Sequence, residues 1–224
     1  MRSRFDRELE KLHQELTKVG ELCEEAISAS VLALLEDDQA MAETARARER
    51  DIDQQERNVE SLCMKLLLQQ QPVARDLRTI SSALKMIGDM ERIGDQAADI
   101  AEITRHIGGA PLPGQVHIEE MTQAAAKMVT SSVASFVRRD LGMARAVMAY
   151  DDVVDQLFCK VKEELTALIR RDAASAGEAL DLLMIAKYLE RIGDHAVNVA
   201  EWVAYSLTGS RYPGPPPAAD APEP

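Results

Sequence analysis

The feature that most constrains this chain is an internal repeat. Residues 91–102 read ERIGDQAADIAE and residues 190–201 read ERIGDHAVNVAE, so eight of twelve positions are identical at a spacing of 99. A second pair of segments matches at an offset of 102, in which Glu49, Ile52, Asp53 and Gln54 correspond to Asp151, Val154, Asp155 and Gln156. Two matching segments in the same order indicate two tandem copies of one structural unit.

Hydrophobic periodicity predicts three helices in each copy. Apolar residues recur at steps of three and four over 5–36, which gives one face of a long helix. Asp37-Asp38 is a suitable cap for a second helix, and Pro72 suits the first turn of a third. The second helix is expected to end at 70 or 71, and the later ones to span 73–107, 118–139, 141–171 and 177–207.

The predicted fold class is all-α, with two tandem three-helix bundles and six long antiparallel helices. Strong helix formers abound, whereas only eight residues are aromatic. Long helices with short connections are typical of antiparallel bundles. The expected units are 1–110 and 111–208, joined by the Gly/Pro-rich segment 108–114, and 209–224 is a Pro-rich segment expected to be disordered.

The acidic composition excludes several classes of partner. A formal net charge of −12 repels nucleic-acid phosphates and anionic lipid headgroups, so neither is an expected partner. The chain has no apolar run of about 18 residues and no apolar signal segment near its start. We therefore expect a cytoplasmic protein that binds cations or a basic surface of another protein.

The three cysteines predict no disulfide framework. Cys23, Cys63 and Cys159 are odd in number, and each lies within a helical pattern. They are expected to be buried free thiols in a reducing compartment.

The third helix of each copy carries a stripe of acidic residues, because residues three and four apart share one face of a helix. In the first copy this face carries Glu91, Asp95, Asp99 and Glu102. In the second copy it carries Glu190, Asp194, Asn198 and Glu201. The second helices add acids at the same spacing, Glu49 and Asp53 in one copy and Asp151 and Asp155 in the other. If these two helices pack side by side, up to six carboxylates of a copy converge.

Clusters of carboxylate oxygens suit hard or borderline cations such as Mg²⁺, Mn²⁺, Fe or Ca²⁺. The alternative is a solvated acidic face that binds no metal. Retention of the acids in both copies favours cation binding. The motifs contain neither the Glu-x-x-His of di-iron bundles nor a phosphate-binding loop or zinc spacing.

Three other residues of the repeated motif carry separate expectations. His195 has Gln96 as its counterpart, which favours a hydrogen-bonding or surface role over that of an obligatory metal ligand. Gly94 and Gly193 lie inside helices at a cost of about 1 kcal/mol each. They predict a close approach of a neighbouring helix.

The repeated motif resembles a known family. The stretches 71–102 and 184–202, which contain the two ERIGD motifs, closely resemble the PhoU family of phosphate-signalling regulators, and the resemblance spans about 3–208. It implies two three-helix bundles, commonly dimeric, with metal clusters bound through E(D)xxxD motifs that match Glu91/Asp95 and Glu190/Asp194. Asp99 and the acids of the second helices match less strictly, and Asn198 replaces a carboxylate.

The resemblance also implies a role and cofactors. Family members keep the phosphate-starvation response off when phosphate is plentiful, by linking the phosphate ABC transporter, through its ATPase subunit, to a sensor histidine kinase. The implied cofactors are divalent or trivalent metal ions (Fe, Mn, Mg or Zn), and the implied assembly is a homodimer.

The resulting prediction is a regulatory adaptor without catalytic activity. The alternatives are a metal-dependent enzyme, such as a phosphatase or a di-iron oxidase, and a helical scaffold without metal. No nucleophile–base pair is visible, and histidine is nearly absent from the acidic motifs, which disfavours an enzyme. Because the motifs place carboxylates in mid-helix and no Arg or Lys cluster, the metal-free chain is not expected to bind free phosphate.

Overall fold

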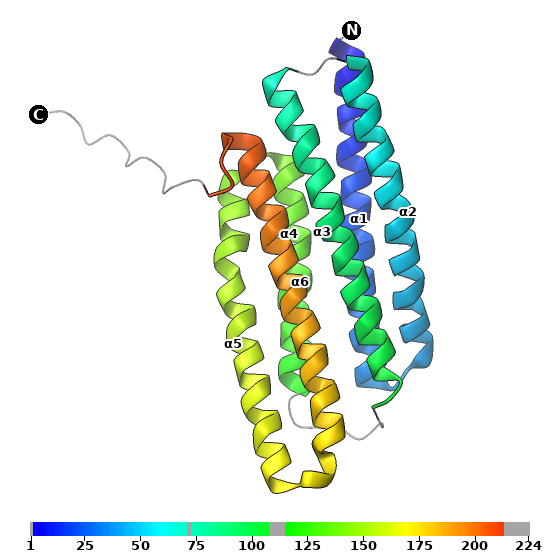
Figure 1. Cartoon of the computed structure of the whole chain (residues 1–224), viewed down its shortest axis with the longest axis vertical. Coiled ribbons are helices and arrows are strands. Elements are labelled where there is room, and N and C mark those ends of the chain that lie inside the picture. Colours follow the sequence, from blue (N-terminus) through cyan, green and yellow to red (C-terminus); the bar gives the residue numbers. More distant parts are fainter. Residues whose placement is uncertain (1, 71–72, 108–114, 213–224) are drawn as a thin grey trace, which may run out of the picture.

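The structure is a computed structural model that describes residues 2–70, 73–107 and 115–212, and within these ranges it contains helices but no strand. Pro72 and the Gly/Pro-rich segment 108–114 lie outside the described residues. The elements, shown in Figure 1, are α1 (Arg2–Glu36), α2 (Gln39–Gln70), α3 (Ala74–Thr104), α4 (Gln115–Arg138), α5 (Leu141–Arg171), the short 3₁₀ helix η1 (Ala173–Ser175) and α6 (Ala176–Thr208). The all-α prediction of six long helices is confirmed, with ends that differ by up to three residues.

The two copies lie side by side and meet through two pairs of helices. In the described part of the chain, α1 packs against α4 and α3 packs against α6, whereas α2 and α5 contact only helices of their own copy. Figure 1 shows α3 and α6 running in opposite directions at the centre, with α2 and α5 at the outer edges. Each copy therefore presents the same third helix to the other.

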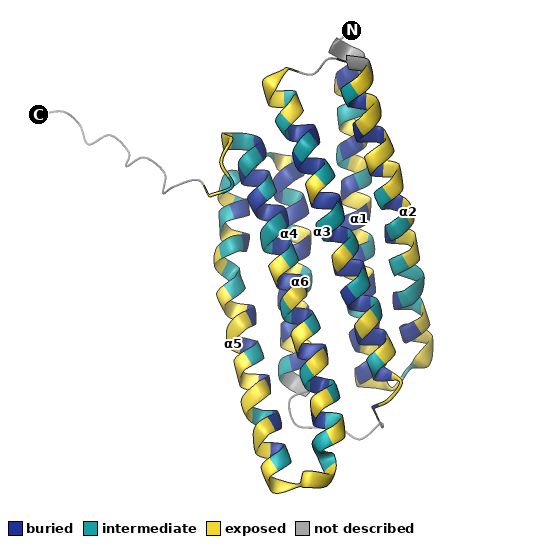
Figure 2. Cartoon of the chain, viewed as in Figure 1, coloured by how far each residue is buried: buried dark blue, intermediate teal, exposed yellow. Residues whose placement is uncertain are grey.

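One large hydrophobic core runs through both copies, and a small separate cluster of alanines lies in the first copy. Fully buried residues of all six helices belong to one contiguous cluster, including Leu16, Ile52, Ile93, Met128, Val154 and Ile192. Figure 2 shows the buried positions on the helix faces that look toward one another, with exposed positions outside. The two predicted bundles thus share their core, and the expected boundary at 110/111 lies outside the described residues.

The helix ends follow local signals that are visible in the sequence. Asp38 caps α2, because its Oδ1 accepts a hydrogen bond of 2.8 Å from the backbone N–H of Ala40. Gly209 ends α6 in the left-handed conformation at φ 85°. Beyond it, the guanidinium of Arg211 lies 4.3 Å above the ring of Trp202. Residues 213–224, most of the segment predicted to be disordered, lie outside the described residues.

The cysteine prediction is wrong at one position. Cys23 and Cys63 are buried free thiols, and burial raises the pKa of each to about 12. Cys159 is free but exposed. The reason is that α5 is an outer helix with a single covered face, which carries Leu157 and Val161, and a residue midway between them points to the other side.

None of the described helices combines the length and apolarity that crossing a bilayer requires.

Candidate functional site

Close packing of helices two and three positions the acidic residues of each copy. A Cβ atom added at Gly94 would lie 2.9 Å from Cδ1 of Ile52 on α2. A Cβ atom at Gly193 would lie 3.4 Å from Oδ1 of Asp151 on α5. Both glycines therefore occupy the close helix approaches that the sequence predicts, and they bring the acids of α2 next to α3 and those of α5 next to α6.

The first acidic cluster contains Glu49, Asp53 and Glu56 on α2 and Glu91 and Asp95 on α3. Burial raises the pKa of Glu91, and repulsion by Asp95 and by both Asp53 and Glu56 across the helix pair adds to it. Burial likewise raises the pKa of Glu49, with repulsion by Asp53 and Asp95. Carboxylates of two helices thus share one electrostatic environment, as the sequence spacing predicts.

Glu56 is a member of this cluster that the sequence reasoning missed. Its pKa is raised by burial and by repulsion from Glu60 and Asp53. Its spacing in the sequence could have indicated this role, because Glu56 lies three residues after Asp53 and seven after Glu49 on the same face of α2.

Arg92 is the counterion of the first cluster. Its Nε lies 3.4 Å from Oε2 of Glu91, and its terminal nitrogen lies 3.2 Å from Oδ2 of Asp95. On a helical wheel Arg92 points away from the acidic stripe, but its long side chain folds back over the surface and spans both carboxylates. The guanidinium remains largely exposed, so this compensation is weak.

The second acidic cluster contains Asp151 and Asp155 on α5 and Glu190 and Asp194 on α6. Burial raises the pKa of Asp151 to about 6, and repulsion by Asp155, Asp194 and Glu190 adds to it. The pKa of Asp194 is also raised, first by burial and then by Glu190. The four positions match those of the first cluster, so the duplication has placed two equivalent acidic sites in one chain.

The second cluster has a different counterion and one carboxylate fewer. Lys187 forms an ion pair with Glu190, and its ammonium lies 5.6 Å from the ring centroid of Phe158. Phe158 occupies the position that matches Glu56 at the offset of 102. An apolar ring thus replaces the fifth carboxylate of the first cluster.

Asp99 and Asn198 lie at the junction between the copies, one turn from the acidic clusters. The amide of Asn198 donates a hydrogen bond of 3.2 Å to Oδ1 of Asp89. The hydroxyl of Tyr188 donates to Asp99, whose pKa is nonetheless raised by burial and by repulsion from Asp95. Asp89 and Tyr188 are matching residues of the repeat, as are Asp99 and Asn198. The same two positions of the repeat therefore meet twice across the antiparallel pair α3 and α6. An amide donates to a carboxylate at one contact, and a phenol donates to a carboxylate at the other.

His195 joins this junction and has the hydrogen-bonding role expected for it. Its Nδ1 lies 3.0 Å from Oδ1 of Asp89, and both side chains are mostly buried. The sequence did not predict a role for Asp89, because this residue lies outside the twelve-residue repeated motif, which begins at Glu91.

Glu102 and Glu201 are not brought into the clusters. Oε2 of Glu102 lies 3.4 Å from Arg46 and 3.3 Å from Arg105. Glu201 is buried and forms an ion pair with Arg211. Each carboxylate lies one turn beyond the junction, where arginines neutralise it.

The donor chemistry of the two clusters fits a hard cation, but their side chains do not form a ready coordination cage. All the converging atoms are carboxylate oxygens, the ligands that such ions prefer. Among the described residues, however, no three His, Cys, Asp or Glu side chains are placed to hold one ion together. Coordination at either cluster therefore requires side-chain rotation within the fixed helix pair.

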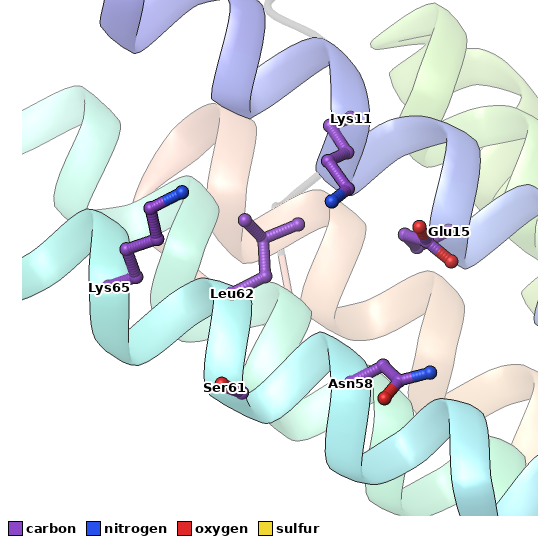
Figure 3. Close-up of a pocket in the computed structure, with 6 residues that line it drawn as sticks. All are labelled: Lys11, Glu15, Asn58, Ser61, Leu62 and Lys65. Carbon is purple, nitrogen blue, oxygen red and sulfur yellow. The ribbon is translucent and has the colours of Figure 1, made fainter.

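A hollow between α1 and α2 contains none of the predicted site residues. Figure 3 shows its lining, which is Lys11, Glu15, Asn58, Ser61, Leu62 and Lys65.

Comparison with known proteins shows which family has this architecture. A PhoU-domain family model matches residues 16–104 and 118–203, which are the two copies. The phosphate-specific transport system accessory protein PhoU homolog of Clostridium acetobutylicum is 35% identical over 92% of this chain and 95% of its own. The corresponding protein of Pseudomonas aeruginosa is 34% identical over 92% of this chain and 86% of its own.

Solved structures agree with these sequence matches. The crystal structure of PhoU from Pseudomonas aeruginosa superposes with a TM-score of 0.87 at 34% identity, covering 92% of this chain and 100% of that one. The phosphate transport system regulatory protein PhoU from Streptococcus pneumoniae gives 0.86 at 28% identity, covering 93% and 99%. With both copies matched in sequence and in fold, this chain belongs to the PhoU family.

Proposed function

We propose that this chain regulates phosphate uptake as an accessory protein of a phosphate transport system. The observation that carries the proposal is the match of both copies to PhoU domains, together with 92% coverage by relatives that are themselves phosphate-specific transport accessory proteins. The relative from Streptococcus pneumoniae is described as a regulatory protein of the same system. No residue of the chain is assigned a catalytic role.

The finer role is that of a cytoplasmic adaptor, which acts as a homodimer. It would contact the ATPase subunit of the phosphate ABC transporter and a sensor histidine kinase, and would repress the starvation response when phosphate is plentiful. The net charge of −12 supports docking on basic protein surfaces in preference to nucleic acid or an anionic bilayer. The long helix pairs offer extended faces for such docking.

The metal proposal concerns the two acidic clusters. Each would hold divalent or trivalent ions (Fe, Mn, Mg or Zn) through its carboxylates, which supply hard oxygen ligands. The raised pKa values of Glu91 and Asp151 support this, because the like charges are held together by the fold without sufficient positive charge. A bound cation would neutralise that repulsion and stabilise the helix pair.

The adaptor role is tested by deleting the gene in its host and restoring it on a plasmid. We expect a phosphate-starvation reporter to be active in phosphate-rich medium after deletion and silent again after complementation. Affinity purification of the tagged chain should recover the transporter ATPase subunit and the kinase. A reporter that stays silent after deletion would contradict the regulatory role, and recovery of neither partner would contradict the adaptor role.

A further inference from the structure

A groove between α4 and α5 on the second copy contains no residue of either acidic cluster. It consists of two adjoining hollows of about 150 and 450 Å³, which share Lys127 and Tyr150. The groove begins at Met143, in the first turn of α5, and extends to Lys160. No residue of α6 is in the lining, although α6 packs against both helices, so the groove lies on the side of the α4–α5 pair away from α6. The apolar part of the lining includes Met128, Val147, Val153 and Leu157.

The first copy does not have the matching apolar surface. At the offset of 102, Tyr150 and Val153 correspond to Arg48 and Asp51. These two residues of the first copy form an ion pair of 2.7 Å on α2. In the second copy the ammonium of Lys127 lies 4.5 Å from the ring centroid of Tyr150, and Val153 is 36% exposed. The second copy therefore has exposed apolar surface where the first copy has an ion pair.

The lining of the groove carries more positive than negative charge, in a chain whose formal net charge is −12. Lys127 and Lys160 line it, against one carboxylate, that of Glu120. Among the described residues, neither lysine has an ion-pair partner, and Lys127 contacts only the ring of Tyr150. Lysines beside apolar surface suit a segment that combines apolar residues with carboxylates.

The segment that follows α6 has the composition that this surface suits. Residues 213–224 read PGPPPAADAPEP and lie outside the described residues. Half of them are proline, and the charged ones are Asp220 and Glu223, with no basic residue. Proline-rich sequences favour the extended polyproline II conformation and bind grooves lined by aromatic rings. Such a segment buries no core of its own, but an existing surface can hold it.

The segment also begins close enough to the groove to enter it. α5 and α6 are adjacent and antiparallel and are joined through 172–175, so the end of α6 lies beside the start of α5 (Figure 1). To enter the groove the chain has to pass over one helix, a width of about 10 Å. Tyr150 lies about 14 Å along α5 from Leu141. A polyproline II chain covers the sum, about 24 Å, in about eight residues, which brings Asp220 beside Lys127.

We propose that residues 213–224 dock in the α4–α5 groove of the same chain. The prolines would cover Tyr150 and Val153, and Asp220 would pair with Lys127. Glu223, about 9 Å further along, would come within reach of Lys160. This docking is independent of the proposed adaptor role and of metal at the acidic clusters. The same segment of a second copy is the alternative occupant, and the experiment distinguishes the two.

Disulfide trapping in the full chain tests the docking. A Cys159→Ser background removes the exposed thiol and leaves the two buried ones. In this background Ala221→Cys is combined with Gln123→Cys, which lies in the groove one turn from Lys127. The matched control combines Ala221→Cys with Gln14→Cys, at an exposed position of α1, a helix that does not contact α5. Under mild oxidation the groove pair should cross-link roughly fivefold faster than the control, because docking raises the local concentration of one thiol at the other.

Two further measurements make the result decisive. Mass spectrometry of mixed isotope-labelled and unlabelled chains shows whether the link forms within one chain. The double change Lys127→Gln with Lys160→Gln should slow the groove link by roughly threefold, because it removes both ion pairs. Its control is Lys85→Gln with Lys162→Gln, two exposed lysines outside the groove.

Circular dichroism confirms that each of these variants is folded. Equal rates for the two cysteine pairs, or a link that forms only between chains, overturn the proposal. An unchanged rate in the folded Lys127/Lys160 variant, or equal slowing in the lysine control, also overturns it.

Discussion

The two acidic clusters have carboxylates at the same four positions of the repeat but different surroundings. Glu91 and Asp95 share the exposed counterion Arg92, and Glu56 adds a fifth acid to the first cluster. In the second cluster, Lys187 pairs with Glu190 over the ring of Phe158. The repeated positions were thus retained, whereas the counterion and the fifth position diverged. The contrast indicates that the four carboxylates, and not their neutralising partners, are the common element of the two sites.

The junction between the copies shows why some matching positions had to differ. Across the antiparallel pair α3 and α6, Asp89 faces Asn198 and Asp99 faces Tyr188. If both copies carried the residues of the first, Asp would face Asp at both contacts, and the two carboxylates of each contact would repel each other. Asn198 and Tyr188 supply donors instead. The carboxylate missing from the second stripe is therefore explained by this contact between copies.

The largest expected effect is on metal content. Alanine at both Asp95 and Asp194 should abolish bound transition metal in protein purified without chelator, because each cluster loses a central oxygen ligand. Either single change should lower the content to that of the remaining cluster. Elemental analysis by mass spectrometry measures this.

The control is a second double variant, Glu36→Ala with Glu163→Ala, which removes two exposed acids outside the clusters and should keep its metal. Full metal content in the Asp95/Asp194 double variant would show that the clusters are not the metal sites.

At the junction, Asp89→Ala should cost about 2 kcal/mol in the free energy of unfolding. The change removes charge-assisted hydrogen bonds to His195 and Asn198 and leaves two mostly buried donors unpaired. Asp99→Asn should cost less, because it also removes repulsion by Asp95. Urea unfolding of the metal-free proteins compares them, and equal costs would show that the two contacts do not differ as described.

The glycines give a smaller test of the helix approaches. Gly94→Ala should be less stable than Gly193→Ala by about 1 kcal/mol, because its Cβ would overlap Cδ1 of Ile52 in the core whereas the Cβ at 193 fits at contact distance. Both changes gain helix propensity equally, so that contribution cancels in the comparison. Thermal or urea unfolding measures the difference. A more stable Gly94→Ala would mean that the first helix pair is the looser one.

The smallest expected effect is on the pH dependence of the metal-free protein. The pKa of Asp151 is raised from 3.8 to about 6, so the folded state binds the proton of this carboxyl more tightly than the unfolded state does. The protonated carboxyl therefore contributes stability that is fully present below about pH 4 and is lost as the pH rises through about 6. Because Asp151 is partly solvated, the loss is below about 1 kcal/mol. Asp151→Asn should remove this part of the pH dependence and be more stable than wild type at pH 7.

Unfolding curves at pH 4.5 and pH 7 measure that difference, with Glu163→Gln, at an exposed position of the same helix, as control. If Asp151→Asn loses as much stability between the two pH values as wild type does, the raised pKa is not the cause.

The sequence by itself determined the helices, the duplication and the eight central acids of the two clusters. These features are local or periodic, since residues three and four apart share a helix face wherever the helix is placed. Gly94 and Gly193 likewise indicated a close neighbour, because glycine in mid-helix has a cost that only packing offsets.

Tertiary structure alone decided which neighbour each face meets. It assigned Asp99 to Tyr188 and Asn198 to Asp89, paired Glu102 with two arginines, and exposed Cys159. A helical wheel gives the direction of a Cα–Cβ bond, but not the reach of a long side chain or the identity of the helix opposite. Those depend on how the two copies pack, and contacts between residues about one hundred positions apart leave no periodic trace in the sequence.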